Sequence, residues 1–328
     1  MVHTMGVRAS GELRKQIRSL EHAGVDGVFV TDHLFVSRGK PRRESRSGDD
    51  PFVLLAAAAM LSDKLILGTS VVNIGFAHPA LAIRSFCELA KLVGGERVLA
   101  GIGAGWNREE FDALGMEFPP FARRMDRLEE AATLARALFD RGFADHAGEH
   151  VTARELPLDQ LSPPPRLLLG GGSDRLLDIA GRHADVVDLN GSSRRLKLGG
   201  AQPVLNDAVR RLTTTVADLA DSVGRVRSSA AAAGRDADRI EFSILVSAIR
   251  FCSGAEVKAV EAELCRQVGI DPQPLGDCPY VFVGPPERMK DQLAARTHRL
   301  RLRHLIIAPV DHDVLVRFRR DVAAAASG

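Results

Sequence analysis

The amino-acid sequence predicts a TIM (β/α)8 barrel that takes up the whole chain, residues 1–328, as a single domain. Short aliphatic runs alternate with longer helical patterns almost from end to end, which is typical of βα units around a parallel sheet. Eight such runs can be counted. Most of them are continuously apolar instead of strictly alternating, as expected for strands that are covered on both faces.

The predicted strands have aliphatic or β-branched interiors, and helical patterns fill the intervals between them. In chain order the strands are expected at Val2–Val7, Gly27–Thr31, Leu65–Asn73, Arg97–Ile102, Arg166–Gly170, Asp185–Leu189, Ile240–Ala248 and Leu305–Ala308. Gly24 supplies a left-handed helix stop and Asp50 an N-cap. Four of the helices are expected at Glu12–His22, Pro51–Leu61, Pro79–Val93 and Arg123–Phe139.

Two stretches depart from the simple βα repeat. Residues 37–50 form a polar, arginine-rich loop after strand two, which is either a solvated loop or a patch that attracts an anionic ligand. Residues 194–238 form a long, mostly helical insertion after strand six. Because both segments follow the C-terminal end of a strand, both are expected to lie over the catalytic face.

Charge, hydropathy and cysteine content exclude several classes of partner. The formal net charge of +2 gives no large uniform field, so neither nucleic acid nor an anionic membrane is expected as a partner. The longest apolar run, Leu54–Leu61, is far shorter than the ~20 residues of a membrane span. The four cysteines show no metal-ligand spacing, so no metal site is expected, and reduced thiols fit a cytoplasmic protein.

Polar residues follow strands two and three at the predicted mouth of the barrel. Strand two ends in Asp32 and His33, and a carboxylate beside an imidazole suits proton transfer near neutral pH. The alternative is that Asp32 caps a loop while His33 packs. Asn73 ends strand three, where it either meets a ligand or ties down its own loop.

Strand four runs into the glycine-rich segment AGIGAGWNREEF. Gly103 and Gly105 carry no Cβ and so permit close approach of a backbone or a flat ring. Trp106 is then either a wall for a planar ligand or part of the core, and Asn107 follows it. Glu110 is equally well explained as a first-turn residue favoured by the helix dipole.

Strand five ends in Gly171, Gly172 and Ser173, directly before a helix. Backbone N–H groups at such a helix start bind phosphate, and glycine lets the phosphate oxygens come near. A dinucleotide fingerprint beginning at Gly170 would need a sixth-position glycine where the chain has Arg175. A phosphate cradle in a barrel is therefore favoured over a dehydrogenase fingerprint.

Six segments in one order carry a resemblance to a known family. They are GVDGVFVTDHL, LILGTSVVNIGFAHPALAIRSF, RVLAGIGAGWNREEFDALGMEF, RRMDRLEEA, PPPRLLLGGGS and ADVVDLN. Together they resemble the luciferase-like monooxygenase superfamily, and in particular its coenzyme F420-dependent oxidoreductases. The resemblance implies a TIM-barrel enzyme, usually a homodimer, that binds F420 or alternatively FMN in the mouth of the barrel.

Site residues follow from the resemblance, position by position. His33 is implied as the acid or base near the deazaflavin, with Asp32 as its orienter or a ring contact. Ser70, Val71 and Asn73 match the segment that backs the ring, where a non-proline cis peptide is typical. Further cofactor contacts are implied at Gly103, Gly105, Trp106, Asn107, Gly171, Gly172, Ser173 and Asn190.

Two departures from the family pattern bear on the reaction. Ala90 and Lys91 stand where the family commonly has Leu-Asp, and Trp106 stands where the sugar-phosphate dehydrogenases carry a catalytic glutamate. The second departure argues against that particular reaction. The main hypothesis is hydride transfer between F420 and a small organic substrate. An FMN-dependent monooxygenase that uses O2 and a non-catalytic flavin-binding barrel are the alternatives.

Overall fold

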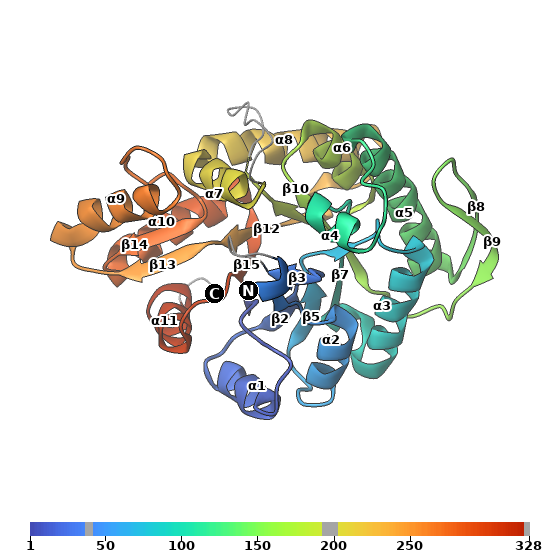
Figure 1. Cartoon of the computed structure of the whole chain (residues 1–328), viewed down its shortest axis with the longest axis horizontal. Coiled ribbons are helices and arrows are strands. Elements are labelled where there is room, and N and C mark those ends of the chain that lie inside the picture. Colours follow the sequence, from blue (N-terminus) through green and yellow to red (C-terminus); the bar gives the residue numbers. More distant parts are fainter. Residues whose placement is uncertain (37–41, 192–202, 325–328) are drawn as a thin grey trace.

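Eight parallel strands close into a barrel within the residues that the structure, a computed structural model, describes: 1–36, 42–191 and 203–324 (Figure 1). Pairing of β7 with β10 completes the ring, with Gly101 opposite Leu168. The predicted TIM barrel is confirmed. In order around the barrel the strands are β1 (Val2–Thr4), β2 (Gly27–Val30), β5 (Ile66–Thr69), β7 (Val98–Gly103), β10 (Arg166–Gly171), β11 (Val186–Leu189), β12 (Glu241–Val246) and β15 (Leu302–Ile307).

Helices cover the outside of the barrel, and their ends carry the expected signals. Asp50 accepts hydrogen bonds from the amides of Phe52 and Val53, and Gly24 adopts a positive φ of 69° after the first helix. The covering helices are α1 (Leu13–His22), α2 (Pro51–Ala59), α3 (Pro79–Val93), α5 (Phe121–Arg141), α6 (Asp174–His183), α8 (Val216–Ala232), α10 (Pro286–Leu300) and α11 (His312–Phe318). Short helical turns occur at Arg42–Glu44, Gly95–Arg97, Ala237–Arg239, Gly254–Glu256 and Arg319–Ala323.

Four predicted strands have clearly different boundaries in the structure. The eighth, expected at Leu305–Ala308, begins three residues earlier, at Leu302. The first is shorter than expected, because the chain leaves the sheet after Thr4. The third is divided into β5 and β6 (Val72–Asn73) by a cis peptide between Ser70 and Val71, as the family resemblance implied. The seventh continues past Ser247 into a separate strand, β13 (Ala248–Phe251).

The segment predicted as an insertion after strand six has two parts with different positions. Its second helix, α8, packs against α6 and α10, so it is a barrel helix and does not lie over the catalytic face. Its first helix, α7 (Pro203–Thr213), brings Arg211 to Ser247 just after β12, on the C-terminal side of the barrel. Residues 194–202 and 37–41 of the two predicted loops lie outside the described residues.

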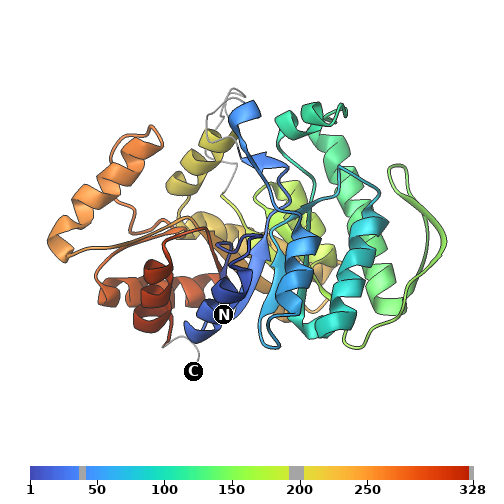
Figure 2. The ribbon, with the colours of Figure 1, turned by 60° about the horizontal axis from the view of Figure 1, so that its bottom comes forward.

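Local sequence patterns did not predict two excursions from the barrel. The antiparallel hairpin of β8 (Phe143–Ala147) and β9 (Thr152–Pro157) projects beyond α5, and β13 pairs with β14 (Val281–Gly284) beside α9 (Val257–Gln267). Figure 2 shows these two excursions at opposite sides of the molecule. The remaining elements, β3 (Phe35–Val36), β4 (Arg46–Ser47) and α4 (Arg108–Ala113), lie near the mouth of the barrel.

The barrel interior is filled by a small apolar cluster that is separate from the larger core between strands and helices. Phe29, Leu99, Leu168, Val186 and Ile306 form this cluster, and the side chain of Val71 packs against it. Burial of each such side chain contributes about 1.5–3 kcal/mol. The barrel is therefore a closed core with no pore, and ligands have access only at its ends.

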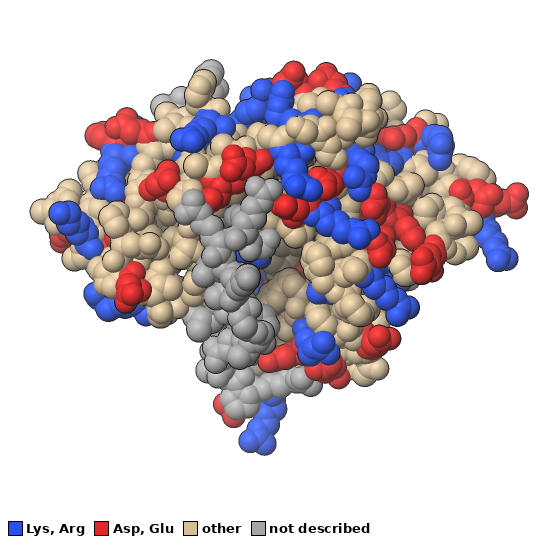
Figure 3. All heavy atoms as spheres, turned by 90° about the horizontal axis from the view of Figure 1, so that it is seen from above, with Lys and Arg blue, Asp and Glu red and all other residues tan. Residues whose placement is uncertain are grey.

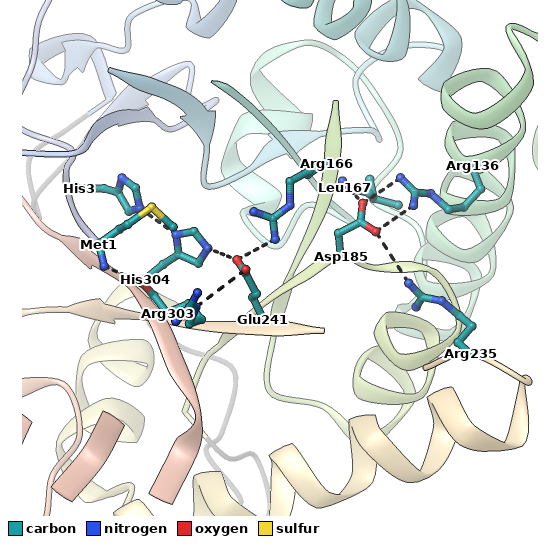
Figure 4. Close-up of polar contacts among 10 residues, drawn as sticks. All are labelled: Met1, His3, Arg136, Arg166, Leu167, Asp185, Arg235, Glu241, Arg303 and His304. Atoms are coloured by element: carbon teal, nitrogen blue, oxygen red, sulfur yellow. Dashed lines mark hydrogen bonds and ion pairs between the residues drawn. The ribbon is translucent and has the colours of Figure 1, made fainter. Parts of the chain in front are cut away.

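A chain of polar contacts crosses the barrel near its N-terminal end (Figure 4). His304 Nε2 lies 2.7 Å from Glu241 Oε2, and His3 Nε2 lies 2.9 Å from His304 Nδ1. Because a carboxylate only accepts, His304 donates through Nε2 and accepts from His3 at Nδ1. Burial raises the pKa of Glu241, but hydrogen bonds from His304 and Arg166 outweigh it and hold that pKa at about 2.

The two buried imidazoles predict a loss of stability in mild acid. Burial lowers the pKa of His3 well below its ordinary value and also lowers the pKa of His304. Below about pH 6.5 the unfolded chain binds protons that the folded barrel excludes, so stability falls by ~1.4 kcal/mol per pH unit for each imidazole. Urea unfolding between pH 7.5 and 5 measures the slope. His3→Gln with His304→Gln should reduce the slope to the part that comes from His183, whose pKa burial lowers to about 4, whereas His22→Gln, at an exposed histidine, should leave it unchanged.

Candidate active site

His33 and Glu110 meet at the C-terminal end of the barrel. His33 follows β2 and Glu110 lies in α4, and His33 Nδ1 is 3.0 Å from Glu110 Oε1. The same oxygen accepts the backbone N–H of Leu34 at 3.0 Å. The Glu110 side chain is only 2% exposed, whereas that of His33 is 30% exposed. Glu110 thus fixes the Nδ1 side of the imidazole, and the rest of the ring remains partly exposed.

The Glu110 carboxylate fixes the proton arrangement of the imidazole. Since the carboxylate accepts, Nδ1 of His33 carries a proton, and in the neutral ring Nε2 has a free lone pair. No hydrogen bond to Nε2 is found within the described part of the chain. Trp106 packs edge-on to His33, with ring centroids 5.6 Å apart. Such an imidazole can accept or donate a proton at Nε2 without losing its orientation.

Asp32 points across to strand three and not to its neighbour His33. Its Oδ2 accepts the backbone N–H of Asn73 at 2.9 Å. Burial raises the pKa of Asp32, and the hydrogen bond from Asn73 opposes that shift. Asn73 in turn accepts the N–H of Gly75 through its side-chain oxygen, at 2.9 Å. Asp32 and Asn73 therefore join the ends of strands two and three, and that oxygen of Asn73 ties down its own loop.

Val71 forms the floor between these groups. Its half-buried side chain lies on the barrel-interior cluster. A Cβ added to Gly103 would overlap the Cγ2 atom of Val71, and one added to Gly170 would lie 3.6 Å from its Cγ1 atom. The missing Cβ of Gly103 thus leaves room for the side chain of Val71, whereas the sequence pattern had indicated room for a neighbouring backbone or a flat ring. Gly105, at φ 71°, likewise makes room for the side chain of Asn73.

Two predicted contact residues already have structural roles through their side chains. Asn107 caps α4 by accepting the N–H of Glu109, and Ser173 caps α6 by accepting the N–H of Leu176. Arg124 donates to the carbonyl of Gly105 and holds the turn before α4. A contact from these residues to a ligand would therefore come from the backbone, from the O–H of Ser173 as donor or from the side-chain NH2 of Asn107 as donor.

The glycine turn after β10 lies directly against the end of β11. The N–H of Asn190 donates to the carbonyl of Gly171 at 3.1 Å, and a Cβ on Gly172 would collide with the carbonyls of Asn190 and Gly191. The side chain of Asn190 accepts the N–H of Gly191. These contacts fix the glycine turn and the end of β11 beside the start of α6. A phosphate-binding turn needs its backbone N–H groups held at such a helix start.

Sequence reasoning assigned no site role to several groups in this region. The sequence left Glu110 open between the mouth of the barrel and a first-turn position favoured by the helix dipole. Arg211 on α7 reaches Ser247 and Tyr280, and Tyr280 donates to the carbonyl of Leu189 at 3.0 Å. These contacts join segments that are far apart in the sequence, so no local sequence pattern predicts them.

Seen from above, Lys and Arg side chains are interspersed with Asp and Glu (Figure 3). In the described ranges, no cluster of three or more His, Cys, Asp or Glu could hold a metal ion. In those same ranges, no helix has both the length and the apolar character that crossing a bilayer demands.

The fold and this mouth define a class of protein: a closed (β/α)8 barrel with an oriented imidazole and a glycine turn at its C-terminal face. A family model described as luciferase-like monooxygenase matches residues 2–199. The chain belongs to the luciferase-like monooxygenase family.

Several curated relatives share the matched region. The chain is 31% identical over 206 residues to an F420-dependent glucose-6-phosphate dehydrogenase of Intrasporangium calvum, covering 61% of this chain and 60% of that protein. It is 32% identical over 204 residues to the enzyme of the same name from Beutenbergia cavernae, covering 61% and 58%. The matches thus span about three fifths of the relatives' length.

Solved structures share the fold at low sequence identity. One is an F420-dependent secondary alcohol dehydrogenase in complex with an F420-acetone adduct, with a TM-score of 0.69, 17% identity and coverage of 99% and 98%. Another is the EDTA monooxygenase of Chelativorans sp. BNC1, with a TM-score of 0.72, 16% identity and coverage of 99% and 92%. Both support the barrel and its connectivity over nearly the whole chain.

Proposed function

We propose that this protein is an oxidoreductase that binds coenzyme F420 in the mouth of the barrel and transfers hydride between it and a small organic substrate. The observation that carries the proposal is the partly exposed imidazole of His33, which buried Glu110 holds at Nδ1 and whose Nε2 has no hydrogen bond among the described residues. The relatives named as F420-dependent dehydrogenases support the choice of cofactor.

The residues at the mouth fit a flat, phosphate-bearing cofactor. Val71 offers an apolar surface backed by Gly103, on which a ring system can lie. Ser70, Val71 and Asn73 would hold the ring from below. Around it we assign Gly103, Gly105, Trp106 and Asn107, and for the phosphate we assign Gly171, Gly172, Ser173 and Asn190. When bound, F420 supplies the hydride acceptor or donor.

The chain itself contributes orientation and a proton. Glu110 holds the Nδ1 proton of His33, so that Nε2 is the atom that takes a proton from, or returns it to, the substrate. Asp32 orients the strand-three segment through Asn73. We do not propose glucose 6-phosphate as the substrate, because Trp106 stands where the sugar-phosphate dehydrogenases carry a catalytic glutamate.

Differential cofactor binding tests the proposal. Fluorescence titration of the purified chain should show F420 bound about tenfold or more tightly than FMN, a difference of ~1.4 kcal/mol. Preference for FMN would favour the alternative of an FMN-dependent monooxygenase. Binding of F420 without turnover on a panel of alcohols, carbonyls and alkenes would favour a non-catalytic barrel. Binding of neither cofactor would refute the proposal.

We also propose that the enzyme is a homodimer formed through the outer face of α2 and α3. α2 contains no charged residue, although it lies on the outside of the barrel. Four large apolar side chains there are exposed: Val53 (68%), Met60 (75%), Leu81 (57%) and Leu92 (58%). An apolar helix surface of this kind is typical of a protein interface. A second copy can cover it with the same surface, on which Arg84 and Glu88 of α3 can pair with their opposite charges across the two-fold axis.

Charge placed on this face should break the dimer. Val53→Asp with Met60→Asp would bury carboxylates without partners in the interface, so the variant is expected to be monomeric in light scattering after gel filtration. Phe143→Asp adds a charge at an exposed apolar residue of the β8–β9 hairpin and should leave the dimer intact. A double variant with unchanged mass would place the interface elsewhere.

The state of the cysteines supports our expectation that the enzyme works in the cytoplasm. All four are free thiols, and Cys87, Cys265 and Cys278 are buried. Burial raises the pKa of the Cys278 thiol to about 11, so that thiol stays protonated and unreactive at neutral pH. A reducing compartment suits such a chain.

A further inference from the structure

A second cavity lies at the end of the barrel opposite the candidate active site. It has a volume of about 1050 Å³ and is lined by residues that precede or begin β10, β11, β12 and β15. These are the N-terminal ends of the strands, whereas His33 and the glycine turn lie at the C-terminal ends. Its volume is of the size that accommodates small-molecule ligands.

The cavity is rich in arginine, and its carboxylates are shared. Six arginines and five carboxylates line it. Three carboxylates in and around it each face two guanidinium groups (Figure 4 shows two of the three). Asp185 faces Arg136 and Arg235, Asp238 faces Arg227 and Arg301, and Glu241 faces Arg166 and Arg303. Each of these carboxylates carries a single negative charge, so it can neutralise only one of the two guanidinium groups that it faces.

Two of the lining arginines have weak or no neutralising contacts. Arg303 approaches Glu241 only to 4.0 Å, and its side chain is 69% exposed. Arg239 is exposed, and no ion pair to it is found among the described residues. Their guanidinium groups therefore have donors free for an incoming ligand.

An apolar wall stands beside these cations. Pro163, Pro164 and Pro165 form one side of the cavity, and Ile240 and Leu302 also line it. Guanidinium forks match the oxygens of phosphate and carboxylate groups, while the proline surface suits a compact organic body. A long polyanion fits poorly, because five carboxylates lie among the arginines.

We propose that this cavity is a binding site for a small organic oxyanion, with its phosphate or carboxylate group held by Arg239 and Arg303 and its body against the proline wall. The site would be separate from the cofactor mouth and would not require the proposed function to be correct. The N-terminal face of a TIM barrel ordinarily serves stability, and a ligand here would act on the molecule away from the chemistry.

Calorimetric titration of the whole chain with pyrophosphate and with citrate, at constant ionic strength, tests the proposal. Saturable binding of at least one probe is expected, and the preferred probe tells phosphate from carboxylate recognition. Arg239→Gln with Arg303→Gln should weaken that binding about tenfold or more. Both side chains are exposed, so the variant should remain folded.

A charge-matched control separates a site from general attraction. Arg14→Gln with Arg18→Gln removes the same charge from the exposed side of α1, which does not line the cavity, and should leave the affinity unchanged. Equal weakening in both double variants, or no saturable binding of either probe, would overturn the proposal. F420 binding should be the same in all three proteins, so a failure of this site is distinguishable from a failure of the proposed function.

Discussion

Replacing His33 with alanine is expected to reduce F420-dependent turnover by about 10²–10⁴-fold while leaving the affinity for F420 within a few-fold of wild type. The side chain is oriented by Glu110 and presents Nε2 to the mouth, so its loss removes the proton donor or acceptor and leaves the Val71 floor intact. Steady-state kinetics with a substrate from the alcohol, carbonyl and alkene panel, together with cofactor titration, measures both quantities.

Glu110 variants separate orientation of the imidazole from its chemistry. Glu110→Gln keeps an oxygen that can accept from His33 Nδ1 and from the Leu34 N–H, whereas Glu110→Ala leaves both donors without a partner. We expect kcat to fall further in the alanine variant than in the glutamine variant, with KM changed little. His22→Ala, at an exposed histidine far from the mouth, serves as the control. Full activity of His33→Ala would remove the proposed proton role.

Gly101→Ala is expected to destabilise the barrel by about 3 kcal/mol or more. A Cβ at this position of β7 would lie far closer to the Thr69 carbonyl oxygen in the neighbouring strand than van der Waals contact allows. The Thr69 hydroxyl also donates to the carbonyl of Gly101 at 2.7 Å, so the two strands cannot separate without losing that bond. Urea unfolding of the purified variant gives the change in free energy.

Gly224 supplies the matched control for that substitution. It lies exposed within α8, and a Cβ added there would meet no atom within 4 Å. Gly224→Ala should therefore stabilise the protein by about 0.5–1 kcal/mol, because alanine loses less backbone freedom in a helix. Equal stability of the two alanine variants would contradict the packing of β5 against β7.

Sequence patterns predicted the central strands well because these strands are buried on both faces. The runs at β7 and β10 have apolar interiors, β11 is apolar except for Asp188, and the predicted boundaries fall within a residue or so of those observed. The strand pattern of Ile240–Ala248 runs on into the residues of β13 without a turn signal, so it does not show that the chain leaves the barrel sheet after β12. The hairpin β8–β9 is mostly exposed and mixes charged with apolar residues, so its pattern is weak.

The candidate site was predictable only in part, for a physical reason visible at Glu110. Asn107 caps α4 and Glu110 occupies the third helical position, which is the spacing of a local capping box. In the structure Glu110 bonds instead to His33 and Leu34, which lie more than 70 residues earlier in the chain. Local propensity and long-range pairing compete for the same side chain, and only the fold decides between them. The positions of Asp32 and His33 followed directly from where strand two ends.

Two of the imidazole–carboxylate pairs among the described residues, His33–Glu110 and His304–Glu241, differ in what the second ring nitrogen contacts. In His33 that nitrogen is open to the mouth of the barrel, so the ring can exchange a proton with a bound ligand while its Nδ1 hydrogen bond to Glu110 stays in place. In His304 it is occupied by His3, and both of these imidazoles are buried away from water. The His33–Glu110 pair can therefore take part in proton transfer, whereas the His304–Glu241 pair has a structural role. Their roles depend on access, since the two pairs share the same chemistry.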